Sequence, residues 1–178
     1  MKRTVLILAA ILTLFALGCG KKTETQWDQN DPNAVFIDPN AVRGGEYGEL
    51  YFEADGVRFG IYDEAAAVLA ALPKETGVHR QASCAFEHED VTHLFPTFEI
   101  MTNEIDGTDR ITAIRITSDL IETPQGLRIG MTAEEAAQAL PALREADWNL
   151  IDGTALLSVT VIDGKVREIV YTPSGTED

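Results

Sequence analysis

The sequence predicts an α+β fold of two tandem strand-helix-three-strand units with antiparallel sheets. Residues 126–137 repeat the pattern of residues 56–67, with glycine, arginine, glycine, glutamate and two alanines at matching positions. Each copy leads into a helix-like run that stops at a Leu-Pro pair, and Asp-Gly pairs separate the alternating apolar runs that follow. We therefore expect an internal duplication, with a first unit at 48–118 and a second at 119–178.

The first 18 residues have the pattern of a bacterial lipoprotein signal peptide. Lys2 and Arg3 precede an apolar run at 5–17, which at about 13 residues is shorter than a usual membrane-spanning helix. The run ends in Gly18 and Cys19 and resembles a lipobox, which implies cleavage after Gly18 and lipidation of Cys19. The protein would then be extracytoplasmic and anchored to the cell membrane, or to an outer membrane if there is one. An ordinary secretory signal or an uncleaved anchor helix remains the alternative.

Residues 19–47 are expected to form the lipidated cysteine and a disordered tether. This segment is rich in Asp, Asn, Pro, Gly and Thr, a composition that does not support a packed core. An Asp-Pro-Asn-Ala-Val run occurs twice, at 31–35 and 38–42, and each copy is typical of a turn or an extended kink. A short docking peptide within 35–42 is the alternative interpretation.

The charge excludes one class of partner. The chain has 14 Lys and Arg against 29 Asp and Glu, a net of −15, and loss of the two basic residues in the signal peptide would make it −17. Nucleic-acid binding depends on positive charge, so we expect no nucleic-acid partner. An anionic membrane surface would repel such a body, which indicates a domain held off the bilayer by its tether. Cys84 is the only cysteine after Cys19, so no disulfide within the mature chain is expected.

In the first unit, an Asp-Gly turn at 55–56 predicts a hairpin between strands at 50–53 and 57–59. Gly60 permits a sharp turn into a helix, and Asp63 is the expected N-cap. The helix should end at Pro73. Its apolar face has the spacing i, i+3, i+4, i+7 and consists of Ala65, Val68, Leu69 and Leu72. A strand near 83–87 and a hairpin of 98–105 with 108–117 are expected to follow.

The second unit should repeat this order. A short strand at 127–129 leads to Thr132 and Glu135, which have the spacing of a capping box, and the helix should stop at Pro141. A three-strand meander is then expected at 148–151, 154–162 and 165–171, with turns at Asp152-Gly153 and Asp163-Gly164.

The run Gly-Leu-Arg-Ile-Gly-Met-Thr-Ala-Glu-Glu at 126–135, followed by a meander, resembles the BamE/SmpA and β-lactamase inhibitory protein group. The tandem duplication is most similar to the inhibitory proteins. Residues 123–132 and 83–87 also resemble uncharacterised small lipoproteins of Gram-positive anaerobes. The resemblance covers about residues 48 to 172 and implies a binding or assembly protein with a protein-facing sheet surface, not an enzyme. The single mature cysteine and the anchor depart from the secreted, disulfide-bonded inhibitors.

Five residues are candidates for binding a partner. Arg58 and Arg128 occupy matching positions in the two copies of the repeat, where they could pair with neighbouring carboxylates or form a duplicated contact for a carboxylate of a partner. Phe95, Phe98 and Trp148 are the aromatic candidates for a binding surface, with core strand positions as the alternative.

A cluster of His, Cys and acidic residues at 79–93 is the candidate metal site. Cys84, His88 and His93 would be its ligands, but the cluster lacks Cys-x-x-Cys spacing, so we expect no cofactor. A strand near 83–87 would instead place Cys84 and Phe86 in the core. A calcium loop at 102–113 would lack a carboxylate at both its first and last positions.

No nucleophile elbow, phosphate loop, zinc-protease helix or dinucleotide motif occurs. The leading hypothesis is therefore a lipid-anchored, non-catalytic, extracytoplasmic binding module that contacts an envelope protein or peptide. It predicts an exposed apolar or aromatic patch on one sheet face. The alternatives are a metal- or small-ligand-binding envelope lipoprotein that uses Cys84 and nearby histidines, and a hydrolase that uses clustered carboxylates.

Overall fold

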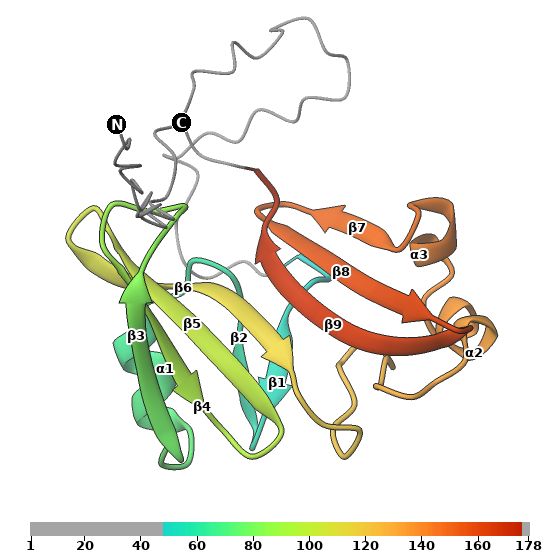
Figure 1. Cartoon of the computed structure of the whole chain (residues 1–178), viewed down its shortest axis with the longest axis horizontal. Coiled ribbons are helices and arrows are strands. Elements are labelled where there is room, and N and C mark those ends of the chain that lie inside the picture. Colours follow the sequence, from blue (N-terminus) through green and yellow to red (C-terminus); the bar gives the residue numbers. More distant parts are fainter. Residues whose placement is uncertain (1–47, 176–178) are drawn as a thin grey trace, which may run out of the picture. The chain divides into compact units, whose positions relative to one another are not determined.

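A computed structural model describes residues 48–175, apart from the side chain of Glu145 (Figure 1). The expected signal peptide, Cys19 and the tether lie outside the described residues, as do residues 176–178. The described elements, in chain order, are β1 (Phe52–Ala54), β2 (Val57–Phe59), α1 (Ala65–Ala71), β3 (Gly77–Ala82), β4 (Glu89–Leu94), β5 (Phe98–Ile105), β6 (Thr108–Ile116), α2 (Ala133–Ala139), α3 (Ala142–Glu145), β7 (Asn149–Asp152), β8 (Ala155–Ile162) and β9 (Lys165–Pro173).

The predicted fold class is wrong, because the described chain is mostly β. β1 and β2 form a hairpin, and the other seven strands form one antiparallel sheet in the order β3-β4-β5-β6-β9-β8-β7. Strands from both predicted units join in this sheet where β6 pairs with β9, through Ile114 with Tyr171, Arg115 with Val170 and Ile116 with Ile169. The second half has no strand at 127–129 and has two short helices where one was expected. The chain is therefore not two strand-helix-three-strand units.

The expected strand at 83–87 is also absent, and β3 and β4 flank this segment instead. The hydroxyl of Ser83 accepts hydrogen bonds from the backbone N–H groups of Ala85 and Phe86 at 3.2 and 3.0 Å. In a strand, these backbone N–H groups would be available to pair with an adjacent strand. Because the Ser83 hydroxyl accepts from them instead, the segment forms a turn. Cys84 is consequently exposed, not buried in the core as predicted.

Three of the four predicted Asp-Gly turns are confirmed. Asp55, Asp106 and Asp163 each have a φ of 52°, and the glycine that follows each one also has a positive φ, as a type I′ turn requires. The fourth turn is shifted by one residue, because Asp152 pairs with Ala155 as part of the sheet. Its two turn residues are 153–154, with glycine first, which is typical of a type II′ turn.

The turns that lead into α1 and α2 correspond in detail, but at a spacing of 68 residues and not 70. The N–H of Gly60 donates to Asp63 Oδ2 at 2.9 Å, and the N–H of Arg128 donates to Met131 Sδ at 3.1 Å. Arg128 therefore corresponds to Gly60 and not to Arg58, which corrects the prediction that the two arginines are equivalent. The spacing is 68 because it is set by the starts of the two helices, and the Leu-Pro pairs that end them have the same spacing. The glycines of the sequence repeat are 70 residues apart and lie at different positions of the two turns.

The two helix starts differ in their caps. The predicted capping box of α2 is confirmed, because Thr132 and Glu135 bond reciprocally through side chain and backbone. The N-cap of α1 is Glu64, without a side-chain cap bond, and not Asp63 as predicted. The Asp63 carboxylate is instead engaged by the N–H of Gly60, in the turn before the helix.

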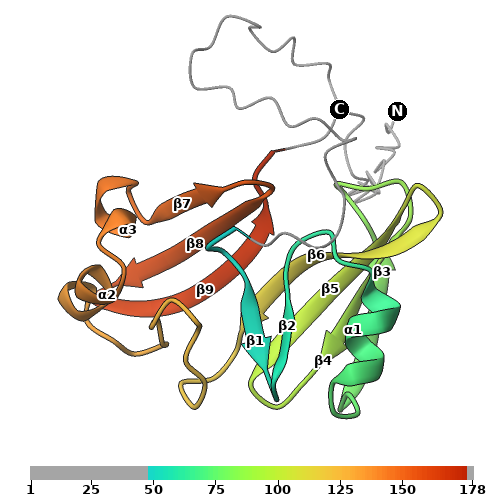
Figure 2. The same ribbon diagram turned by 180° about the vertical axis from the view of Figure 1, so that it is seen from behind.

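One face of the seven-stranded sheet is covered. Figure 2 shows the β1–β2 hairpin and α1 in front of this face, and the predicted apolar face of α1 packs into the core there. Ala136 of α2 and Leu143 of α3 belong to the same buried cluster. The core includes the aromatic rings of Phe52, Phe59, Phe98 and Tyr171, all at most 3% exposed. Among residues 48–175, no helix combines the length and the apolar character needed to cross a membrane.

Candidate functional site

The opposite face of the sheet, here called the open face, is crossed by none of the described helices (Figure 1). Side chains of a strand alternate between the two faces, so the positions between the buried ones point to the open face. The pairing registers align these positions across six strands. The open face consists of Thr92, Leu94, Glu99, Met101, Ala113, Arg115, Asn149, Ile151, Leu156, Ser158, Thr160, Glu168, Val170 and Thr172.

A row of four apolar side chains and two threonines runs across this face from β4 to β7. Met101 lies opposite Ala113 and Thr92, and Leu156 lies opposite Thr172 and Ile151. A sheet face in contact with water usually has polar residues at such positions. Ile151 is 46% exposed and the other members of the row are partly exposed. Its apolar members are Met101, Ala113, Leu156 and Ile151, and Thr92 of β4 and Thr172 of β9 occupy the other two positions of what is here called the apolar row.

A charged group lies beside the apolar row, on β5, β6 and β9. The Arg115 guanidinium lies 3.0 Å from a carboxylate oxygen of Glu168 and 4.0 Å from one of Glu99. The side chain of Arg115 is 55% exposed, that of Glu168 is 39% exposed and that of Glu99 is 29% exposed. One positive charge therefore faces two negative ones, and the group as a whole is acidic.

The structure places two of the aromatic candidates in the core. Phe95 and Phe98 are 7% and 3% exposed, and their rings stack with centroids 4.7 Å apart. They are not part of a binding surface, because Phe98 points to the covered face of β5. Trp148 is partly buried against the core. Its backbone N–H donates to the carbonyl of Leu143, and its backbone carbonyl accepts from the backbone N–H of Val159.

The two arginine candidates lie in different surroundings. Arg58 forms an exposed ion pair with Glu53 at 3.3 Å and lies over the ring of Tyr51, 4.1 Å from its centroid. Arg128 lies in the turn before α2, near Glu135. Hydrogen bonds from Thr132, together with the positive charges of Arg128 and Lys165, hold the pKa of Glu135 below its usual value. Neither arginine lies on the open face.

The candidate metal ligands are not brought together. His93 points to the covered face and its Nδ1 lies 2.7 Å from a carboxylate oxygen of Glu75, whereas His88 pairs with Glu104 at 3.7 Å on the surface. Within the described part of the chain, no group of three or more His, Cys, Asp or Glu side chains could hold a metal ion.

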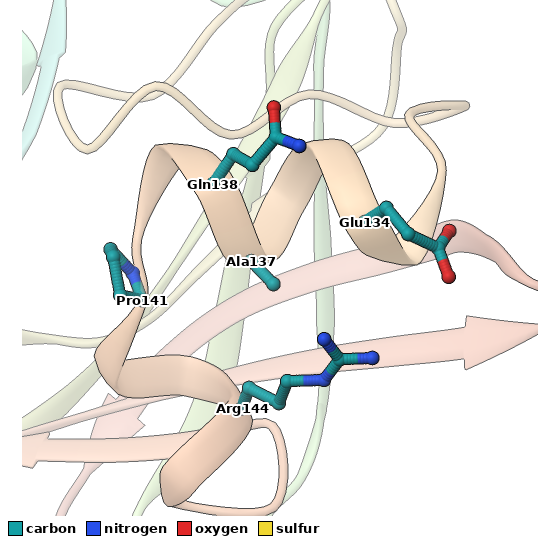
Figure 3. A pocket seen from close by; sticks show the side chains of 5 residues that line it. All are labelled: Glu134, Ala137, Gln138, Pro141 and Arg144. Carbon is teal, nitrogen blue, oxygen red and sulfur yellow. The ribbon is translucent and has the colours of Figure 1, made fainter.

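A shallow depression of about 330 Å³ lies between α2 and α3. Figure 3 shows that Glu134 and Gln138 project away from each other and that Arg144 comes from α3. The polar side chains that line the depression are exposed, so they provide no buried group to orient a ligand. The depression is lined by Glu134, Ala137, Gln138, Pro141 and Arg144.

The comparisons with known proteins identify no relative. The chain matches no protein-family model, and no curated protein or solved structure is significantly similar to it. The geometry of the open face therefore provides the argument about function.

The residues of the open face were not among the predicted site residues. A signal for them exists in the sequence, because β5, β8 and β9 have apolar residues at both odd and even positions. Met101 stands beside Ile100, Leu156 beside Leu157, and Val170 beside Ile169. Apolar residues on both faces of an antiparallel strand indicate that both faces are covered, in the monomer or in a complex.

Proposed function

We propose that this protein is a lipid-anchored, extracytoplasmic, non-catalytic binding module that contacts an envelope protein or peptide through the open face. The observation that carries this proposal is the apolar row, which runs across a sheet face that no described element covers. Surfaces of this kind are characteristic of protein-interaction sites. The expected lipidation of Cys19 supplies the anchor, and the expected tether at 19–47 would give the module reach from the membrane.

The dimensions of the open face suit a small interface. Six strands at a spacing of about 4.8 Å make the open face roughly 24 Å wide, and five residues of β9 extend about 17 Å along the strand. The resulting footprint of about 400 Å² is below the roughly 800 Å² per partner of a standard interface. This size favours a peptide-sized contact or a transient complex.

The open face favours binding over acid–base catalysis. Its two carboxylates, Glu99 and Glu168, both face the same cation, Arg115. Catalysis by paired carboxylates needs a cleft that positions a substrate between them. A sheet face with a central ion group and an apolar row provides contact area and orientation for a partner.

The test is affinity capture from cross-linked intact cells, with tagged full-length protein and a control of residues 1–47 alone. The double variant Met101→Glu, Leu156→Glu introduces two charges into the apolar row. Leu120→Glu is the matched control, because Leu120 is 84% exposed and outside the sheet. We expect one protein that is enriched by the wild type and by Leu120→Glu but lost with the double variant. Equal recovery with the double variant, or nothing above the 1–47 control, would contradict the proposal.

A further inference from the structure

We infer that the partner of the open face is a cationic amphipathic helix, with aliphatic side chains on the apolar row and a Lys or Arg beside Glu99. This inference rests on the proposed function and adds the chemistry of the partner to it. Three features of the described residues carry it: the geometry around Glu99, the surplus of negative charge, and the spacing of the apolar row.

Glu99 has an incompletely satisfied carboxylate. Arg115 lies 1.0 Å closer to Glu168 than to Glu99, at 3.0 and 4.0 Å, and the longer distance is at the limit for an ion pair. No other ion pair or hydrogen bond of the Glu99 side chain occurs within residues 48–175. A carboxylate can accept several hydrogen bonds, so Glu99 can take a second cation without giving up Arg115.

The surroundings of Glu99 determine which side chains should flank that cation in the partner. Leu94 lies directly opposite Glu99 on β4, and Met101 is two residues along β5 on the same face. A charge pair flanked by apolar side chains is shielded from water once a partner covers it, so the attraction is stronger than at an open surface. The matching group is a Lys or Arg that is flanked by aliphatic side chains.

The charge of the described body excludes other occupants of the face. Residues 48–175 contain nine Lys and Arg against 22 Asp and Glu, a net of −13. A second copy of the chain or an anionic membrane surface would be repelled by this charge, whereas a cationic segment would be attracted to it. Association with such a segment should therefore be fast and sensitive to salt.

The spacing of the apolar row matches a helix better than a strand. Neighbouring strands lie about 4.8 Å apart, so the row presents one side chain at about every 4.8 Å across the sheet. Residues three and four apart on a helix lie roughly 5 to 6 Å apart along one side, which is nearly the same repeat. The row crosses six strands over about 24 Å, so a helix of about 19 residues, with a length of about 29 Å, is long enough to cover it.

The test uses a synthetic 19-residue helical peptide with leucines along one side and lysines beside them. A second peptide has glutamates in place of the lysines. Binding to the full-length chain in micelles of an uncharged detergent is followed by fluorescence anisotropy, with protein-free micelles as the blank. We expect binding of the lysine peptide only, and a loss of about tenfold or more in affinity from 50 to 500 mM salt, as for an electrostatically steered complex.

Two variants make the test specific to the face. Glu99→Gln should weaken binding about fivefold, because one charge pair is lost. Met101→Gln should weaken it about tenfold, as for a central apolar contact. The matched control Glu122→Gln removes one exposed charge outside the sheet and should leave the affinity unchanged. Equal binding of the two peptides, or equal losses for Glu99→Gln and Glu122→Gln, would overturn the inference.

The inference and the proposed function can fail separately. A photo-reactive residue at position 101 in intact cells will identify the segment of any protein that lies on the face. An acidic or uncharged segment there would overturn the inference and leave the proposed function standing. No cross-linked protein at all would overturn the proposed function. Binding to anionic vesicles in preference to the lysine peptide would overturn the inference, because the occupant would be a lipid surface.

Discussion

The two faces of the seven-stranded sheet both contain apolar side chains, but in different amounts and different surroundings. The buried side chains of the covered face are mostly apolar, whereas six of the 14 open-face residues are apolar. On the covered face, Ile100 and Ile114 pair across β5 and β6 and are fully buried under the hairpin and α1. On the open face, the next pair along the same strands is Met101 and Ala113, and both are partly exposed. Apolar residues in a strand therefore do not by themselves mark the core of this protein. The comparison separates residues that stabilise the fold from residues available for a partner.

The largest expected effect comes from removing a core ring. Phe98→Ala removes a side chain that packs against Phe52, Phe59 and Phe95, so we expect a loss of about 3 to 5 kcal/mol in the free energy of unfolding. Met101→Ala, three residues along the same strand, should cost no more than about 1 kcal/mol because it is only partly buried. Urea denaturation of the full-length protein measures both. Equal losses would show that the open face is part of the core.

A smaller loss of stability is expected when the side-chain hydrogen bonds of Gln125, here called the polar link, are removed. The amide of Gln125 donates to the carbonyl oxygens of Glu49 and Tyr51 and accepts from the hydroxyl of Tyr171, whose pKa is raised by burial. Gln125→Ala should destabilise the fold by about 1 to 3 kcal/mol, because these groups lose a hydrogen-bond partner and Tyr171 is buried. Gln138→Ala, on the exposed side of α2, is the control and should change stability by less than about 0.5 kcal/mol. A similar loss for both would contradict the role of the link.

The cap of α2 should contribute less still. Thr132→Ala removes one half of the capping box, so we expect a loss of about 1 kcal/mol in urea denaturation. Replacement of the N-cap of α1 by alanine, Glu64→Ala, should have little effect on stability, because Glu64 makes no side-chain cap bond. Neither variant should alter binding at the open face. Loss of binding in Thr132→Ala would show that α2 contributes to the site.

The smallest effect is a pH dependence confined to the acid range. The pKa of Glu135 is lower in the folded protein than its ordinary value of 4.5, so the unfolded chain takes up a proton first as the pH falls. The stability that this group contributes is complete above pH 4.5 and is lost as the pH falls through the folded pKa. Glu135→Gln should therefore flatten the acid side of the stability curve and leave the region near pH 7 parallel to the wild type. A changed slope near pH 7 would contradict this assignment.

Local turn chemistry was the most predictable part of the fold. Asp-Gly pairs define three hairpins because both residues tolerate a positive φ, and the Thr132–Glu135 spacing defines the start of α2. The fourth turn slipped by one residue, since Asp152 continues the ladder to Ala155. The predicted repeat is two residues out of register with the structure, because glycines at matching positions of the sequence lie in different turns. Tyr62 and Gly130 occupy the same position in the two turns, and both have a positive φ. The sequence does not show this match, because one residue is a tyrosine and the other a glycine.

The candidate site was less predictable than the fold. Phe95 and Phe98 were attractive as aromatic residues, but their ring stacking in the core depends on contacts with β1 and β2, which are distant in the sequence. An exposed apolar patch on one sheet face is expected from the sequence, and the apolar row is the candidate that we propose for it. Its members could not be chosen, because the sequence does not show which face the helices cover. Only the strand order and the register bring Met101 and Leu156 onto one surface.

The most direct test of the central claim is a photo-cross-linking scan of the full-length protein in intact cells. Photo-reactive residues are placed one at a time at Met101 and Leu156 on the open face, and at Leu120 outside the sheet as the control. We predict that both open-face positions cross-link to the same envelope protein and that position 120 does not. Cross-links from position 120 to that protein with equal yield, or none from either open-face position, would contradict the assignment of the open face as a binding surface.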